Sequence, residues 1–389
     1  MAQAESNRVS LKVSKETTWN ETPSTPTMLA LPYTRESLNH QKRTKQSDVL
    51  RSDRMKDAQV QVGVSAEGDI NFELRFLDFD TLLEVALAST YATQSTTGAG
   101  TSNNFAFAAA SGGTQVITGP SNWTTNYLVG AWVRVKSATQ SANNGIFKIT
   151  AKTSTTLTVA NTAGVIEANS TAQVNQKCLR NGTTKQSLLI EKQYNDLTNN
   201  FINYRGMRVD GLSMSITSEQ IITGAFRFKG VRGNLATSTV AGGTTAASSN
   251  ESMTASTNVG SIVEGGASLS TGIKSITFNL SNNTRALAAV GNVAAIGINM
   301  GSLMVTGRAE AYFEDQALLT KVFSHTSSAL EFRCTDSGGN VMIYTFSQLR
   351  WSGNPDNPGI DQDVMLPLEF SCEREPTNNV MFQIDSLAP

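Results

Sequence analysis

Alternation of apolar and polar residues is the feature that most limits how this chain can fold. Four apolar side chains recur at every second position from Ile70 to Phe76, and Asn71, Glu73 and Arg75 occupy the positions between them. A second run alternates in the same way, with Val364, Leu366, Leu368, Phe370 and Cys372 on one face. A spacing of two places successive side chains on opposite faces of a strand. The sequence therefore predicts two-faced β-strands, each with one face in a core.

Further strands are predicted along most of the chain. Composition agrees, because only 16% of residues are charged and Ser, Thr, Asn and Gly are abundant, which suits sheets joined by turns. We expect a hairpin turn at 66–69. Two short helices are expected, the first with Leu82, Val85 and Ala86 buried. The predicted strands lie in residues 59–64, 70–76, 128–137, 145–152, 155–160, 186–196, 207–217, 220–230, 273–280, 303–313, 330–335, 341–346 and 364–372.

Acidic residues gather between Glu67 and Glu84, which raises the question of a catalytic or metal site. Their positions favour architecture instead. Asp78, Asp80 or Thr81 is placed to cap the first helix, and Asp315 stands at the same place before the second. The order strand, strand, acid-capped helix and strands thus occurs twice, which predicts an internal duplication.

Three segments differ from this pattern. Residues 1–45 carry Pro23, Pro26 and Pro32 with little periodicity and are predicted to form an extended N-terminal arm, whose deletion should leave a folded monomer that cannot polymerise. Residues 92–177 are predicted to be a small inserted all-β domain that begins with a linker over 93–115. The core domain would then comprise 46–91 and 178–389, with a flexible low-complexity loop over 232–270.

No catalytic chemistry is indicated. The two histidines, His40 and His325, lie far apart, and the three cysteines form no CxxC pair. No phosphate-binding motif is present. We therefore predict no catalytic residues, no metal site and no cofactor. The N-terminus lacks an apolar signal segment, and residues 290–305 are too short to span a membrane, so we expect a soluble intracellular protein.

The ordered succession of these patterns resembles the phage tail tube (major tail) proteins of long non-contractile tails. The resemblance rests on SDVLRSDRMKD (47–57), EGDINFELRFLDFDTLLEVALAS (67–89), KCLRNGTTKQSLLIEKQYNDL (177–197) and FINYRGMRVDGLSMSITSEQIITGAFRFKG (201–230), and it leaves out residues 92–177. In the second half it rests on IKSITFNLSNNTRALAAVG (273–291), GSLMVTGRAEAYFED (301–315) and LPLEFSCERE (366–375).

This resemblance implies a mainly β, duplicated fold of two packed antiparallel sheets with short flanking helices. It further implies that six subunits form a ring and that rings stack into a virion tube. Its partners would be a tape-measure protein, tail-tip and head–tail connector proteins, and the phage DNA that passes without specific binding. Assembly would take place in the host cytoplasm, with no membrane involved.

Two sets of candidate residues follow. The DNA duplex carries one negative charge per ~1.7 Å of its axis, so a basic tube wall would bind it. We therefore expect the lumen to be lined by the polar side chains that alternate with apolar ones along the strands. These candidates are Asp69, Glu73, Glu310 and Glu369, although Arg75, Arg227 and Arg308 share their faces. Arg51, Asp53 and Arg54 are candidates for contacts between stacked rings.

Other functions remain open at this point. One is a tube protein of a contractile tail or a related secretion system, which would be shorter. Another is a glycan-binding β-protein that uses Trp123 and Trp132, although these residues are more typical of a core. An enzyme built on Asp78-Phe-Asp80 is the least favoured alternative.

Overall fold

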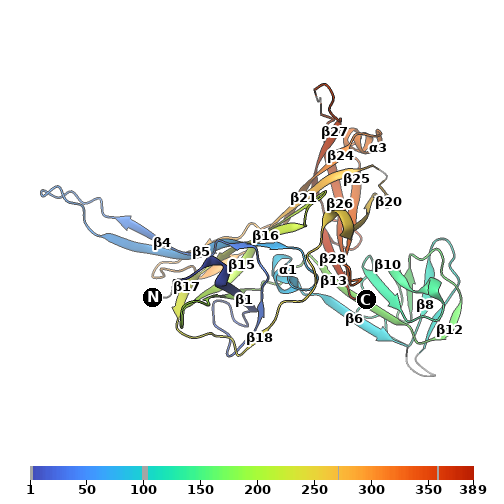
Figure 1. Ribbon diagram of the computed structural model, residues 1–389, viewed down its shortest axis with the longest axis horizontal. Helices are drawn as coiled ribbons and strands as arrows, with labels where there is room; N and C mark the ends of the chain where they lie inside the picture. The colour runs from blue at the N-terminus through green and yellow to red at the C-terminus, as the bar shows by residue number, and fades with distance from the viewer. Residues whose placement is uncertain (1–2, 99–103, 270, 357–358) are drawn as a thin grey trace. The chain divides into compact units, whose positions relative to one another are not determined.

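The computed structural model describes residues 3–98, 104–269, 271–356 and 359–389 (Figure 1). It is mainly β, as the sequence predicts, and divides into two compact units. Unit 1 comprises residues 1–88, 183–255 and 273–310, and unit 2 comprises residues 89–182, 256–272 and 311–389.

Unit 1 is built around a four-stranded antiparallel sheet in the order β5–β16–β15–β21. Alternate side chains of these strands form its core, including Phe72, Phe226 and Phe278. The elements of unit 1 are η1 (Ser6–Arg8), β1 (Val9–Lys15), β2 (Thr27–Ala30), β3 (Arg35–Glu36), β4 (Asn39–Gln46), β5 (Gln59–Glu73), α1 (Asp80–Ala86), β14 (Leu188–Tyr194), β15 (Phe201–Thr217), β16 (Thr223–Gly230), β17 (Arg232–Ala236), β18 (Gly243–Thr245), β21 (Ile273–Ser281), β22 (Arg285–Leu287), β23 (Gly297–Asn299) and most of β24 (Met304–Tyr312).

Unit 2 has a sheet in which β26 pairs with β25 on one side and with β27 and β28 on the other. Its core includes Phe332, Tyr344 and Phe346. The elements of unit 2 are β6 (Ala92–Thr97), β7 (Phe105–Phe107), β8 (Gln115–Thr118), β9 (Trp132–Lys136), η2 (Ser141–Asn143), β10 (Gly145–Lys152), β11 (Thr156–Val159), β12 (Glu167–Ser170), β13 (Gln173–Arg180), α2 (Ala255–Asn258), β19 (Val259–Glu264), β20 (Ala267–Ser268), α3 (Ala317–Phe323), β25 (Ser327–Thr335), β26 (Val341–Gly353), β27 (Met365–Cys372) and β28 (Phe382–Leu387).

The two units share an order of strand pairing. In unit 1, α1 is followed by β14, β15, β16 and β17, and β15 pairs with β14 and with both β16 and β17. In unit 2, α3 is followed by β25, β26, β27 and β28, and β26 pairs with β25 and with both β27 and β28. The same succession in both units supports the predicted duplication.

Residues 1–45 contain strands that the sequence analysis did not predict. β1 pairs antiparallel with β14 over seven residues, and Leu11, Val13 and Met28 are buried. Deletion of these residues would remove core side chains and expose β14. We therefore expect that deletion to destabilise unit 1, contrary to the sequence-based expectation of a folded monomer.

The predicted hairpin turn at 66–69 is wrong. β5 runs without interruption from Gln59 to Glu73 and pairs with β4 and then with β16. Gly68 serves a different purpose, because a Cβ there would lie 2.5 Å from the carbonyl oxygen of Ser37. The glycine allows close approach of two backbones rather than a turn.

The helix caps follow the prediction only in the second half. α1 has no side-chain cap, and Asp78 instead accepts a hydrogen bond from the amide of Ser248 at 2.6 Å. In front of α3, Asp315 accepts a hydrogen bond from the amide of Ala317 at 2.8 Å. The first cap prediction was wrong because a distant segment, 245–252, supplies Asp78 with a donor.

Two segments expected to be irregular contain strands. The predicted linker over 93–115 holds β6 and β7, although part of it, 99–103, lies outside the described residues. The predicted loop over 232–270 holds β17, β18, α2, β19 and β20. β19 pairs with β25, so a partner remote in sequence orders a segment with weak local signals.

Candidate assembly surfaces

The sheet of unit 1 has one face made almost entirely of small polar side chains. Across the four strands, Asn71, Ala225, Ser213 and Asn279 are directly opposite one another, and so are Glu73, Thr223, Ser215 and Thr277. A third row comprises Asp69, Arg227, Gly211 and Ser281. The face thus carries two acids and one base over twelve positions, and every other residue is uncharged. Prediction of lumen residues from charge alone does not identify these hydroxyl and amide side chains.

Asp69 and Glu73 lie on this polar face, as the alternation predicts. Glu73 accepts a hydrogen bond at 2.7 Å from the hydroxyl of Ser252, which also accepts one from Arg75. These contacts hold the Glu73 carboxylate at the sheet surface. Asp69 lies opposite Arg227 in the same row.

Arg227 is itself held by a buried carboxylate. Asp210 lies 3.1 Å from the Nε of Arg227 and 3.3 Å from the Nζ of Lys229, and it accepts hydrogen bonds from the amide and hydroxyl of Thr284. Burial opposes ionisation, but the Thr284 hydrogen bonds and the charge of Lys229 hold the pKa of Asp210 below its usual value. No local pattern in the sequence predicts this cluster, because its members come from β15, β16 and the segment after β21.

Glu310 and Glu369 come from strands other than these four. Glu310 is half-buried in β24, and Glu369 is exposed in β27, opposite Ser352 of β26. Both remain candidates for a lumen surface.

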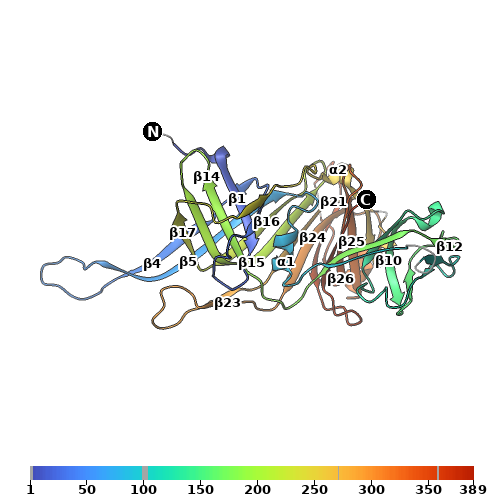
Figure 2. The ribbon, with the colours of Figure 1, turned by 90° about the horizontal axis from the view of Figure 1, so that it is seen from below.

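A two-stranded hairpin extends away from the rest of unit 1 (Figures 1 and 2). It is formed by β4 and the first part of β5 and is called here the β4–β5 hairpin, residues 39–67. Its connecting segment is held by Arg51, which contacts Asp53 at 2.6 Å and Asp57 at 2.8 Å. The guanidinium of Arg51 lowers the pKa of Asp53, so this pair is ionised and self-contained. Two of the three predicted ring-contact residues therefore shape the hairpin tip. The Arg54 side chain forms no hydrogen bond or ion pair with the described residues.

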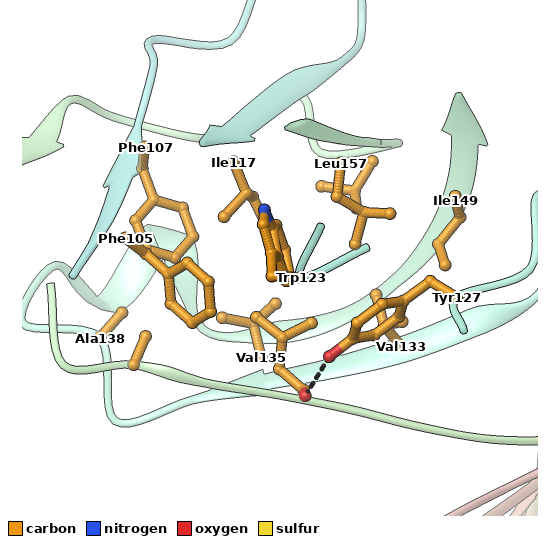
Figure 3. Packing of buried hydrophobic residues seen from close by; sticks show 13 residues of the cluster. Phe105, Phe107, Ile117, Trp123, Tyr127, Val133, Val135, Ala138, Ile149 and Leu157 are labelled. Carbon is orange, nitrogen blue, oxygen red and sulfur yellow. Dashed lines mark hydrogen bonds between the residues drawn. The ribbon is translucent and has the colours of Figure 1, made fainter. Parts of the chain in front are cut away.

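The inserted β-strands enclose their own apolar core. Phe105, Phe107, Ile117, Trp123, Tyr127, Val133 and Leu157 pack together, as Figure 3 shows. Tyr127 donates a hydrogen bond to the carbonyl of Val174 at 2.7 Å, and the indole of Trp123 donates to the carbonyl of Thr155. Trp132 packs against Val341, Ile343 and Leu387 and donates to Glu331. Neither tryptophan offers an exposed ring to a sugar.

A buried acid lies where the start of β9 meets β13 and β28. Asp385 is fully buried and accepts hydrogen bonds from Gln383 at 2.6 Å and from the amide of Trp132 at 3.3 Å. The thiol of Cys178 is a further partner, and Arg180 lies near enough to interact with its charge. Burial raises the pKa of Asp385 to about 7.

This acid makes unit 2 sensitive to pH. The stability that a raised pKa confers is complete below about pH 4, where the unfolded carboxyl is protonated, and is lost as pH rises to about 7. The unfolding free energy of the wild type should therefore fall as the pH rises from about 4 to about 7. We expect Asp385→Asn to make this fall smaller by roughly 1–4 kcal/mol, because one pKa unit corresponds to 1.36 kcal/mol. Urea unfolding of both proteins from pH 4.5 to pH 8 measures this difference, and parallel curves would contradict the assignment.

Other kinds of site have little support. Within the described ranges, no group of three His, Cys, Asp or Glu side chains is arranged to hold a metal ion. The described helices are all too short or too polar to cross a membrane.

Comparison with known proteins identifies the family of the chain. The family model described as phage tail tube protein matches residues 6–372. The matched range includes 92–177, which the sequence analysis left outside the resemblance. No curated protein matches the sequence. A match over nearly the whole chain, to a family of structural tail components, shows that the chain belongs to the phage tail tube protein family.

Proposed function

We propose that this protein forms stacked rings that build the tube of a long non-contractile tail, through which phage DNA is delivered. One observation carries the proposal beyond family membership. The four-stranded sheet of unit 1 has an apolar face in the core and a second face of Ser, Thr and Asn with a formal charge of −1 from Asp69, Glu73 and Arg227. A wall of such faces is hydrophilic but offers DNA few cations to bind.

The physical reason concerns counterions. Binding of DNA to Lys and Arg releases condensed cations, which makes a basic surface adhesive. Hydroxyls and amides release none, and isolated carboxylates repel the phosphates. A lumen lined by this face would therefore let the duplex slide. Asp69 and Glu73 are the acids proposed for it in unit 1, and Glu310 and Glu369 are proposed for the remaining wall.

Ring composition is part of the proposal. The sequence-based prediction is six subunits per ring, which at 41.6 kDa per chain gives about 250 kDa. Because each chain holds two units with the same strand order, three chains would also supply six units, at about 125 kDa. Native mass spectrometry of isolated rings distinguishes these two masses.

The partners follow from a tube of this kind. We propose a tape-measure protein inside the growing tube and connector and tip proteins at its ends, with assembly in the host cytoplasm. The protein would have no enzymatic role. A glycan-binding function gains no support, because Trp123 is buried and Trp132 is partly buried against Val341, Ile343 and Leu387.

A reconstruction of the assembled tube tests the proposed lumen. We expect Asp69, Glu73, Ser213 and Thr277 on the inner surface. A tube in which these side chains face outward would overturn the assignment of this face.

A further inference from the structure

The β4–β5 hairpin is positively charged. Residues 39–67 contain six cations (Lys42, Arg43, Lys45, Arg51, Arg54, Lys56) and four acids (Asp48, Asp53, Asp57, Glu67), a net charge of +2. The four acids include both partners of Arg51. The positive charge that remains available lies mainly along β4, on Lys42, Arg43 and Lys45.

The same hairpin exposes aliphatic side chains. Val60 is 60% exposed and lies opposite Lys45, and Val62 lies at the irregularity beside Arg43. Leu50, in the connecting segment, is 98% exposed. Large apolar side chains gathered on one projecting element are typical of a contact surface.

The backbone of the hairpin is also incompletely paired. Among the described residues, β4 pairs only with β5. A two-stranded ribbon alone is marginally stable in water, and its open edges favour pairing with another chain. The hairpin therefore suits a partner that supplies both negative charge and apolar contacts.

One surface of unit 2 has this complementary character. Residues 312–315 and 360–364, called here the acidic patch, contain Glu314, Asp315, Asp361 and Asp363 and no Lys or Arg. The amide of Phe313 donates to the carbonyl of Val364 at 3.0 Å, so the two segments lie side by side. Ile360 is 91% exposed, and Tyr312 and Val364 are also exposed.

We propose that the β4–β5 hairpin of one copy docks on the acidic patch of a second copy of this chain. This inference rests on the proposed function and names the surface that receives the hairpin. Opposite charges and exposed aliphatic side chains meet in such a contact, with Arg43 and Lys45 facing Asp361 and Asp363. The two surfaces differ, so the contact is head-to-tail and leaves a free hairpin and a free patch for further copies, as a growing tube requires.

Paired charge reversals test the contact. The hairpin variant is Arg43→Glu with Lys45→Glu, the patch variant is Asp361→Lys with Asp363→Lys, and the combined variant carries all four changes. Each two-residue variant brings like charges together, so we expect the protein concentration needed for polymerisation to rise at least about tenfold. The combined variant restores opposite charges and should polymerise within about threefold of the wild type.

Two controls accompany these variants. Lys274→Glu with Arg285→Glu changes the net charge as the hairpin variant does, at exposed positions outside both surfaces, and should polymerise like the wild type. Thermal unfolding of every variant confirms that the monomer is folded.

The outcomes separate the inference from the proposed function. If wild-type protein forms tubes but the single-surface variants do so equally well, or the combined variant is not rescued, the docking inference is wrong and the tube function stands. If hairpin reversal instead abolishes binding to DNA or anionic vesicles, with polymerisation unchanged, a different partner occupies the hairpin. If the wild type never polymerises, the proposed function fails and the inference with it.

Discussion

Replacement of residues 45–60 by Asn-Gly is expected to abolish tube formation while leaving the monomer folded. Thr44 and Gln61 are directly opposite each other in β4 and β5, so a two-residue turn can join them without a change of register. None of the removed residues is buried. The shortened chain loses Lys45, Leu50 and Val60, and with them most of the surface proposed to contact a second copy.

Sedimentation and electron microscopy measure the polymer, and thermal unfolding measures the monomer. We expect no tubes at concentrations at least tenfold above the wild-type threshold, with a melting temperature close to that of the wild type. Tubes of normal length from the shortened chain would show that the hairpin is dispensable. A large fall in melting temperature would instead assign the hairpin a role in folding.

Phe226→Ala is expected to have the largest effect on stability of any single substitution considered. The Phe226 side chain is fully buried, and its ring lies 4.9 Å from that of Phe72 and 6.2 Å from that of Phe79, which immediately precedes α1. Truncation of a buried Phe leaves a cavity and costs about 3–5 kcal/mol. The loss would loosen the packing of α1 on the sheet that carries the proposed lumen face.

Phe323→Ala provides the matched control, since the same atoms are removed from a side chain that is 75% exposed. Chemical denaturation should give a change within about 0.5 kcal/mol for this variant. Equal effects of the two substitutions would mean that Phe226 is not part of a packed core.

Local alternation correctly predicted the strands whose faces differ most in polarity. Ile70, Phe72, Leu74 and Phe76 are all buried, as are Leu366, Leu368, Phe370 and Cys372. Val364, at the start of the second run, is exposed because it precedes β27. Such strands can be recognised from sequence because the buried face requires an apolar residue at every second position.

Strands stabilised by distant partners could not be recognised in this way. β19 shows this, since it has no alternation of its own and is ordered by pairing with β25. Gly68 was misread for the same reason, since the backbone that requires a glycine there belongs to Ser37. The conformation of β19 and the need for a glycine at position 68 depend on contacts with residues distant in sequence, which a local sequence pattern does not show. β1 is a different case: Val9, Leu11 and Val13 alternate with polar residues, so a local signal for this strand was present and was overlooked.

For the candidate sites too, local features could be predicted from the sequence and contacts between distant residues could not. The sequence placed Asp69 and Glu73 on one polar face, because that follows from their spacing. It could not show that Arg51 and Asp53 pair with each other, or that Asp385 is enclosed by β13 and the start of β9. It also could not show the uncharged rows that Ser213 and Asn279 complete, since these rows form only when four strands align.

Electron microscopy of the purified protein tests the central claim most directly. The account predicts that negatively stained samples at high protein concentration contain rings or stacked tubes with a central channel. A folded protein that remains monomeric at every concentration tested, in the absence and presence of assembled tail tips, would contradict it.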